Sequence, residues 1–444
     1  MAALETNSGR TRWLTLAAVT LAVGIVAGLG GMAVGLLLHL VQHIAYGYSL
    51  HAIVGPENFL QGTSAASPLR RLVVLCVCGA VAGSGWWAIY RFGRPLVTVS
   101  KAVAENGEKI PLFTTIAHDF LQVVTVGMGS PLGRESAPRE VSAALATQIV
   151  DRAGLTPEQS RIMIACAAGA GLAAVYNVPL GGTLFTLEVL LGTFSFSALI
   201  PALATSVIAT VVAWIGLGSE AQYALPPLSI SAPLVVWSVV MGPVFGFAAY
   251  GFVRAAGAAH ARAPKDWRLP VWCALVFPAI GVLAMRFPEV LGNGRGVALV
   301  GFDNDVTIGL AAALLGLRMV ASLGALRAGA TGGLMTPGLT FGALLGIVLG
   351  GAWNHAFTAV PLGAFAVVGS AAFLASSMKM PLTAIVLMLE FTRVGQDFLI
   401  PMLFAVSGSI SVYSLCTQHI LLPFWELHHD DLPKVREARA AAGV

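Results

Sequence analysis

The residue best placed to do chemistry in this chain is Glu135. It lies within segment 127–140, where glycines, two prolines and four charged residues interrupt an otherwise apolar sequence. A carboxylate between hydrophobic runs is costly inside a membrane and is typical of a transport site. Because Glu135 follows Gly133 and Arg134 at the expected start of a helix, it lies where backbone amides favour an anion. We therefore expect its carboxylate to compete with a transported anion and to leave the site when protonated.

The composition limits the class of protein. Of the 444 residues, 57% are hydrophobic and 10% are charged, whereas a soluble domain has about 25% charged residues. Apolar runs recur from about residue 13 to residue 421, and several of them are too short to span a bilayer. The sequence therefore predicts an all-α polytopic membrane protein.

Other classes of site find little support. The net charge is +4 with scattered basic residues, which does not indicate a nucleic-acid partner. The five cysteines show no CxxC spacing, so neither a disulfide framework nor a zinc site is expected. The adjacent His428 and His429 belong to a polar tail and are interpreted as solvated surface. We expect no metal and no other cofactor.

Basic residues flank the apolar part of the chain, at Arg10 and Arg12 and again beyond Pro423. The positive-inside tendency places both ends in the cytoplasm, which requires an even number of crossings. We expect residues 1–12 to form a cytoplasmic N-terminal segment and residues 425–444 to form a short cytoplasmic tail.

An internal repeat relates the two halves of the chain. Pro179 and Pro381 lie 202 positions apart; each precedes a leucine and is followed nine residues later by a glutamate, Glu188 or Glu390. We interpret the two glutamates as sharing an architectural task such as helix capping or bonding at an interface.

A second pair of matching segments lies upstream of these prolines. Segment 127–140 in the first half corresponds to Gly333–Pro337 in the second, where Thr336 offers a hydroxyl in place of a carboxylate. Segments broken by glycine and proline at matching positions of two halves are typical of a transporter site formed by discontinuous helices. We predict a first membrane repeat over 13–225 and a second over 226–424.

Four motifs carry a family resemblance: Gly133-Arg134-Glu135, Asn177-x-Pro179-Leu180 leading to Glu188, Gly333-x-Met335-x-Pro337, and Pro381 to Glu390. Over nearly the whole chain they resemble the CLC family of anion channels and anion/proton antiporters. The resemblance implies a CLC-type inverted repeat of broken and tilted helices, with Glu135 as gate and proton carrier. It further implies a homodimer in the bacterial inner membrane, with anions, protons and the lipid bilayer as its partners and no enzymatic activity.

Departures from the family pattern bear on the choice of anion. Pro95 follows Arg94 where most members carry an anion-contacting serine, and Val189 stands at the position of the inner proton-transfer glutamate. These departures, with Thr336 after Met335, resemble the branch that exports fluoride in exchange for protons. Fluoride is small and strongly hydrated, so short donors such as a hydroxyl and backbone amides suit it. Fluoride/proton exchange is therefore the predicted function.

The residues predicted to bind the anion are Pro95, Leu96, Gly133, Arg134, Gly333, Met335, Thr336 and Tyr413. Pro95 points instead to nitrate, unless a shifted register places Leu96 there. Tyr413 aligns best with the family's pathway tyrosine, and Phe424 or Trp425 takes that role under a different gap. Arg139 and Glu140, like Arg134, are also expected to pair and to cap the helix.

Three other functions remain open. The first is a chloride or nitrate/proton antiporter, and the second is a passive CLC anion channel that keeps the glutamate gate. An intramembrane enzyme is the remote third, because the chain contains neither an HExxH zinc helix nor a G-x-S-x-G nucleophile elbow. Proton movement driven by an anion gradient in liposomes separates these functions.

Overall fold

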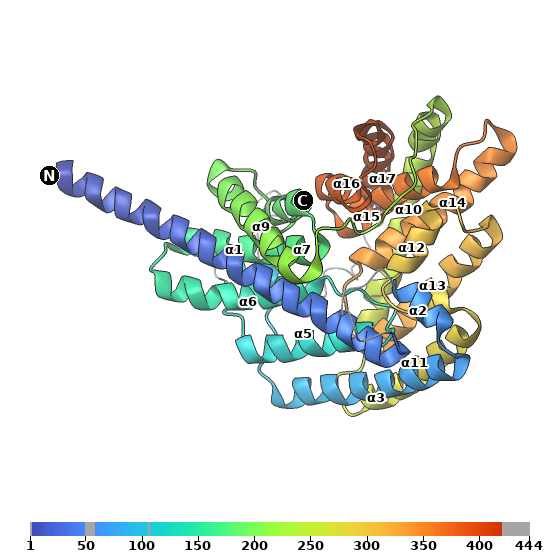
Figure 1. Cartoon of the computed structure of the whole chain (residues 1–444), viewed down its shortest axis with the longest axis horizontal. Coiled ribbons are helices and arrows are strands. Elements are labelled where there is room, and N and C mark those ends of the chain that lie inside the picture. The colour runs from blue at the N-terminus through green and yellow to red at the C-terminus, as the bar shows by residue number, and fades with distance from the viewer. Residues whose placement is uncertain (1, 49–57, 105–106, 420–444) are drawn as a thin grey trace.

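The computed structural model describes residues 2–48, 58–104 and 107–419, which form a bundle of helices (Figure 1). The first half contains α1 (Ala2–Tyr46), α2 (Phe59–Ala65), α3 (Pro68–Phe92), α4 (Val99–Ala102), α5 (Leu112–Gly127), α6 (Ser136–Ala153), α7 (Pro157–Tyr176), α8 (Pro179–Leu184), the π-helix η1 (Phe185–Leu191) and α9 (Phe196–Leu217). The second contains α10 (Ala232–Ala261), α11 (Arg268–Arg286), the 3₁₀ turn η2 (Pro288–Val290), α12 (Arg295–Phe302), α13 (Ile308–Ala328), α14 (Met335–Ala356), α15 (Leu362–Met378), α16 (Pro381–Thr392), the 3₁₀ turn η3 (Gln396–Phe398) and α17 (Leu399–His419).

Eight helices in the described part of the chain are long and apolar enough to cross a membrane. Four shorter apolar helical segments, among them α5, α15 and α16, reach only part of the way through a bilayer of about 30 Å at 1.5 Å per residue. The predicted mixture of spanning and shorter apolar helices is thus confirmed.

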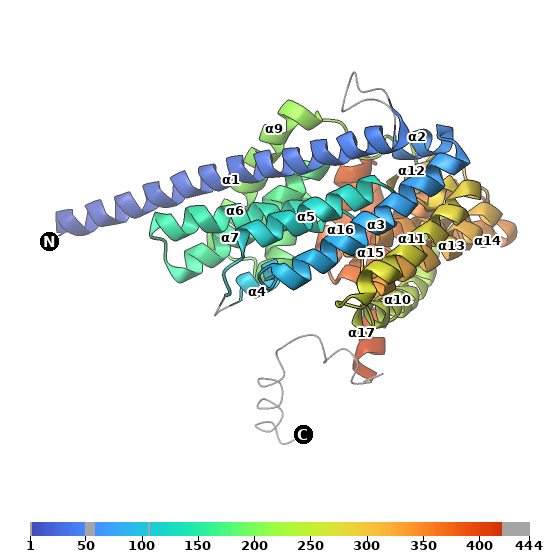
Figure 2. The ribbon, with the colours of Figure 1, turned by 90° about the horizontal axis from the view of Figure 1, so that it is seen from below.

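The two halves pack against each other along equivalent helices. In Figure 1 most of the blue-to-green half lies on the left and most of the yellow-to-red half on the right, while α2 and α3 reach across to α12 and α11. Figure 2 shows α1 running along the first half, where it packs against α5, α6, α7 and α9. The equivalent long helix of the second half, α10, packs against α17. Broken helix ends are thereby surrounded by spanning helices.

The backbone repeats its conformation at the matching breaks. α7 ends at Asn177 with φ of 56°, and α15 ends at Lys379 with φ of 55°, both in the left-handed conformation that stops a helix. The next residues, Val178 and Met380, also match, with φ, ψ of −133°, 69° and −136°, 65°. A proline then opens α8 and α16, which suits the first position of a helix because proline lacks an N–H. The predicted internal repeat is confirmed at the level of single dihedral angles.

The repeat glutamates cap helices in the opposite half. The Glu390 carboxylate accepts hydrogen bonds from the amides of Leu180 at 3.0 Å and Gly181 at 2.7 Å, at the start of α8. The Glu188 carboxylate accepts from the amides of Leu382 at 3.0 Å and Thr383 at 2.7 Å, at the start of α16. A carboxylate at a helix N-terminus is stabilised both by these bonds and by the helix dipole. The predicted capping role of both glutamates is confirmed.

Candidate functional site

The two broken segments meet at a pair of glycines. The amide of Gly133 donates to the carbonyl of Gly333 at 2.7 Å, and the amide of Gly333 donates to the carbonyl of Gly133 at 2.8 Å. This reciprocal pair joins the segment before α6 to the segment before α14. The two helices therefore begin next to each other, as the matching motifs predict.

Glu135 lies at the start of α6 and crosses to the other half. Its side chain is fully buried, and Oε1 accepts a hydrogen bond from the backbone amide of Thr336 in the first turn of α14. Its second oxygen, Oε2, has no hydrogen-bond partner within the described residues. A carboxylate oxygen thus stands at the helix end where an anion would be favoured.

Two glycines, Gly133 and Gly333, leave room for this carboxylate because they lack a Cβ atom. A Cβ atom built on Gly333 would lie 3.0 Å from Glu135 Cδ and closer still to Oε2, and one built on Gly133 would crowd the same carboxylate. Neither glycine has a positive φ, so the need for glycine here comes from this close approach alone.

Arg134 lines a cavity of about 170 Å³. It is 4% exposed, its guanidinium lies 5.3 Å from the centre of the Tyr176 ring, and its Nε and Nη1 atoms have no hydrogen-bond partner among the described residues. Arg295, His39 and Glu220 line the same cavity, where the two arginines outnumber the single carboxylate. The expectation that Arg134 is paired is wrong for these two atoms, while its contact with an anion stays a prediction.

Arg139 and Glu140 belong to a different cavity, of about 150 Å³, which Thr98 and Phe185 also line. Arg139 Nε donates to the carbonyl of Glu135 at 2.8 Å, and its guanidinium lies 5.1 Å from the centre of the Phe185 ring. Arg139 thus binds a carbonyl at the start of α6, whereas the free backbone groups of a helix start are N–H donors, so its predicted helix-capping role stays a prediction.

Helix α7 separates the two cavities. Ala168 lines the cavity beside Glu140, whereas Ala174 and Val175 line the cavity beside Arg134. At 1.5 Å per residue these positions are roughly 10 Å apart along the helix. Between them, a Cβ on Gly171 would collide with the carbonyl oxygen of Pro138, so α6 and α7 touch backbone to backbone there. The cavity beside Arg134 and the cavity beside Glu140 are therefore separate.

Among the other predicted anion ligands, Met335 and Thr336 are buried at the start of α14, next to the carboxylate. Pro95 is exposed and Leu96 half-buried in the loop before α4, and Pro95 lines a third cavity together with Lys109 and Asp151. No hydrogen bond described here joins that loop to Glu135.

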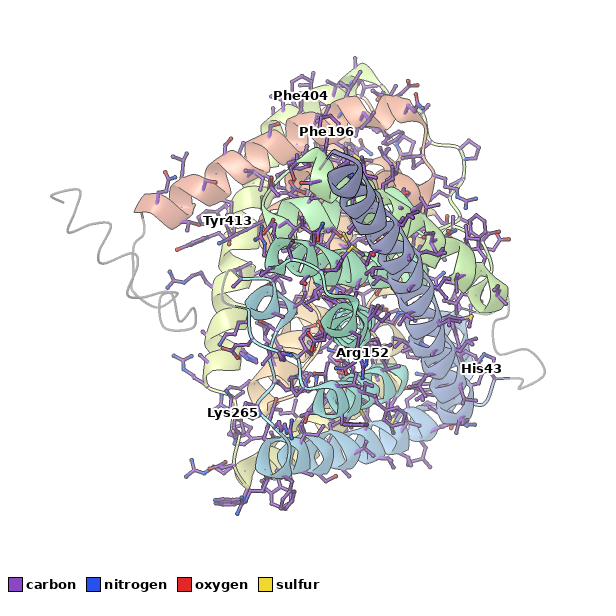
Figure 3. The ribbon with its side chains drawn as sticks, turned by 90° about the vertical axis from the view of Figure 1, so that its left-hand side faces the viewer. His43, Arg152, Phe196, Lys265, Phe404 and Tyr413 are labelled. Atoms are coloured by element: carbon purple, nitrogen blue, oxygen red, sulfur yellow. The ribbon has the colours of Figure 1, made fainter. Side chains whose placement is uncertain are left out.

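Tyr413 lies late in α17 (Figure 3), where its ring is 6.1 Å from that of Tyr250 on α10. No ring contact or hydrogen bond in the described residues connects Tyr413 to Glu135 or Thr336. Phe424 and Trp425, the alternatives for the pathway aromatic, lie outside the described residues.

Tyr176 is a site residue that the sequence reasoning missed. It is buried at the end of α7 near Arg134, Thr336 and Glu135, and its hydroxyl has no hydrogen-bond partner among the described residues. The signal was its position directly before Asn177, at the break between α7 and α8. An aromatic hydroxyl there contributes a donor next to the helix end where an anion is favoured.

Comparison with known sequences identifies the family. The family model described as "Voltage gated chloride channel" matches residues 78–414, which is most of the chain. The voltage-gated ClC-type chloride channel ClcB of Citrobacter koseri is 28% identical over 371 residues, covering 78% of this chain and 85% of that protein. The H⁺/Cl⁻ exchange transporter ClcA of Klebsiella pneumoniae is 30% identical over 298 residues, covering 64% and 62% respectively.

Comparison with solved structures supports the same fold. The crystal structure of a slow cyanobacterial Cl⁻/H⁺ antiporter superposes with a TM-score of 0.79 at 20% identity, covering 93% of this chain and 96% of that one. The structure of a CLC-type fluoride/proton antiporter gives a TM-score of 0.67 at 20% identity, covering 91% and 98%.

The chain therefore belongs to the CLC family of anion channels and transporters. It is a multi-pass membrane protein with the CLC fold, and it is not an enzyme.

Proposed function

We propose that the chain is a proton-coupled anion antiporter in which Glu135 is both the gate and the proton carrier. The observation that carries this proposal is the hydrogen bond that the Glu135 carboxylate accepts from the Thr336 amide at the N-terminus of α14. Neighbouring residues of Glu135 line two separate cavities. An ionised carboxylate on this amide occupies the position that the helix end offers to an anion. An arriving anion and the carboxylate compete, so one must leave before the other binds.

Protonation supplies the exchange step. The amide and the helix dipole hold the ionised carboxylate, and both attractions weaken once the carboxyl group is neutral. The neutral side chain can then leave the helix end, carry its proton, and admit an anion. Return of the side chain requires loss of the proton and departure of the anion, which links the two movements in opposite directions.

Chloride is our first candidate for the anion. The relatives ClcB and ClcA, at 28% and 30% identity, carry chloride in their names, and this outweighs the fluoride preference expected from Thr336 and Val189. Fluoride is the second candidate, because the hydroxyls of Thr336 and Tyr176 lie beside the carboxylate and would suit a small, strongly hydrated anion.

We also propose that the protein is a homodimer in the inner membrane with both termini in the cytoplasm. Each chain would consist of a first membrane repeat, 13–225, and a second, 226–424. Support for the dimer comes from α8 and α16, which the repeat glutamates hold together and which expose Leu180 and Leu382 at matching positions. Cysteine cross-linking at Leu382 in native membranes tests it, and a monomer at all oxidant concentrations would contradict it.

The central test uses purified protein in liposomes with an outward anion gradient. Wild type should drive protons uphill, and Glu135→Gln should retain anion flux while proton movement disappears. Glu158→Gln is the matched control, because Glu158 is a surface carboxylate paired with Arg161 at 3.0 Å. Uphill proton pumping by Glu135→Gln would disprove the gate role.

The anion is identified in the same liposomes by comparing chloride, fluoride and nitrate efflux at equal gradients. Chloride flux above fluoride flux supports the first candidate. The reverse order restores the fluoride assignment, and nitrate flux above both would indicate that Pro95 shapes the selectivity.

A further inference from the structure

We propose that His118, Asp119 and Glu140 form a proton-transfer station that supplies Glu135; this inference rests on the proposed antiport. The three side chains come from two helices, α5 and α6, and we call them the His-Asp-Glu cluster. Their ring nitrogen and carboxylate oxygens lie within 4.8 Å of one another. Two carboxyl groups and an imidazole at such a distance can pass one proton among them.

The cluster is deeply placed and incompletely bonded. Asp119 is fully buried, and His118 is 7% exposed with its Nδ1 atom 3.4 Å from Asp119 Oδ1. Asp119 Oδ2 has no hydrogen-bond partner in the described part of the chain. A buried carboxylate with a bare oxygen is costly unless it holds a proton or receives one.

One end of the cluster reaches an opening. Glu140 is half-buried and lines the cavity of about 150 Å³ that also includes Thr98 and Ser100, both exposed. This cavity lies on the side of Gly171 away from the cavity of Arg134. A proton can therefore enter at the Glu140 carboxylate without crossing the anion opening at Arg134.

The other end of the cluster approaches the gate. His118 Nε2 lies 3.0 Å from the hydroxyl oxygen of Thr331, two residues before Gly333, whose Cα borders the Glu135 carboxylate. A hydroxyl can accept one proton while donating another. The cluster thus extends from the cavity at Glu140 to Thr331, in the segment that packs against Glu135 through Gly333.

The cluster would replace a proton carrier that the sequence lacks at position 189, where the family resemblance places a proton-transfer glutamate. Val189 stands directly after the capping residue Glu188, and its hydrocarbon side chain can hold no exchangeable proton. The His-Asp-Glu cluster lies on α5 and α6 instead, and its residues are not among the capping pairs.

The same three residues could ligate a divalent cation, but their surroundings favour a proton. The charged group that faces the cluster from α6 is Arg139, a cation, and the uncharged Trp86 ring on α3 lies 6.5 Å from the His118 ring. A guanidinium next to two carboxylates offsets their charge and opposes a second cation. Loss or gain of one proton changes the net charge of the group by only one unit.

The test measures proton and chloride fluxes together in liposomes for wild type, Glu140→Gln, His118→Gln and the double variant. We expect proton flux to fall at least tenfold with chloride flux within about threefold of wild type, since Glu135, the Thr336 amide and the Arg134 cavity are unchanged. Glu140→Asp, which keeps a carboxylate, should recover most of the proton flux. Glu158→Gln is the control, and added Zn²⁺ or a chelator should change neither flux.

Several results would overturn the inference. Suppose that Glu140→Gln and His118→Gln keep the wild-type ratio of proton to chloride flux while Glu135→Gln abolishes coupling. That result would reject the proton-transfer station and leave the gate proposal intact. Equal loss of both fluxes without recovery in Glu140→Asp would assign the cluster a structural role. Dependence on Zn²⁺ would make it a metal site. Absence of proton movement in the wild type would reject the antiport and the station together.

Discussion

Replacing Gly333 by alanine should displace the Glu135 carboxylate from its closed position although Glu135 itself is not mutated. The new Cβ would lie 3.0 Å from Glu135 Cδ, whereas carbon atoms in contact are about 3.5–4.0 Å apart, so the carboxylate must withdraw by roughly 1 Å. The bond from the Thr336 amide to Oε1 is then stretched beyond hydrogen-bond range. Gly333 has no positive φ, so alanine adds no backbone strain.

The size of the effect follows from that one bond. A hydrogen bond to a charged group contributes about 1.5–3 kcal/mol, which corresponds to about a tenfold to hundredfold shift from the closed to the open position. Chloride efflux from liposomes should increase, and the number of protons moved per chloride should fall. Both changes resemble those expected for Glu135→Gln, although the acid is still present.

A matched control is available within the same protein. Gly316 lies on α13, and a Cβ there would meet no atom within 4 Å, so Gly316→Ala should leave both fluxes unchanged. Wild-type coupling and wild-type efflux in Gly333→Ala would refute the assignment of the closed gate to this carboxylate position. Loss of all flux in Gly333→Ala with normal folding would refute the competition between the carboxylate and the anion.

Three further changes have defined outcomes. Glu390→Ala removes two hydrogen bonds to the start of α8 and should lower the free energy of unfolding by about 2 kcal/mol, seen as a lower midpoint of thermal unfolding in detergent; an unchanged midpoint would contradict the cap. Arg318→Met removes the guanidinium that donates to the carbonyls of Glu289 at 2.7 Å and Gly292 at 2.8 Å. We expect the free energy of unfolding to fall by about 3 kcal/mol or more in the same assay. Stability equal to wild type would show that other donors replace Arg318. Tyr176→Phe removes the hydroxyl near Thr336 and should weaken apparent chloride affinity about fivefold while proton coupling persists; unchanged affinity measured by titration calorimetry would exclude the hydroxyl from the anion path.

Much of the fold could be predicted because its signals are local in the sequence. Prolines at fixed spacing from glutamates, such as Pro179 with Glu188, specify where a helix starts and which carboxylate can cap one. The identity of the capped helix could not be read from one half, since Glu188 binds α16 rather than α8. Partners across the two halves depend on how the repeats face each other.

The site was predicted in part for the same reason. Glu135 and Thr336 were assigned from broken-helix motifs, and the structure brings them into contact. Tyr176 was missed because a tyrosine at the end of an apolar helix is indistinguishable from core. The His-Asp-Glu cluster was missed because His118 and Glu140 lie 22 residues apart on different helices, so only the crossing of α5 and α6 reveals their proximity.

The exchange of carboxylates between halves has a consequence for biosynthesis. The amide of Leu180 is bound by a residue that follows it by 210 positions, so α8 leaves the ribosome without the group that completes its first turn. Glu188, in turn, emerges 194 residues before the Leu382 amide that it accepts from. Neither half caps its own member of the α8 and α16 pair, so the first turn of α8 stays uncapped in the membrane until the second half has been inserted.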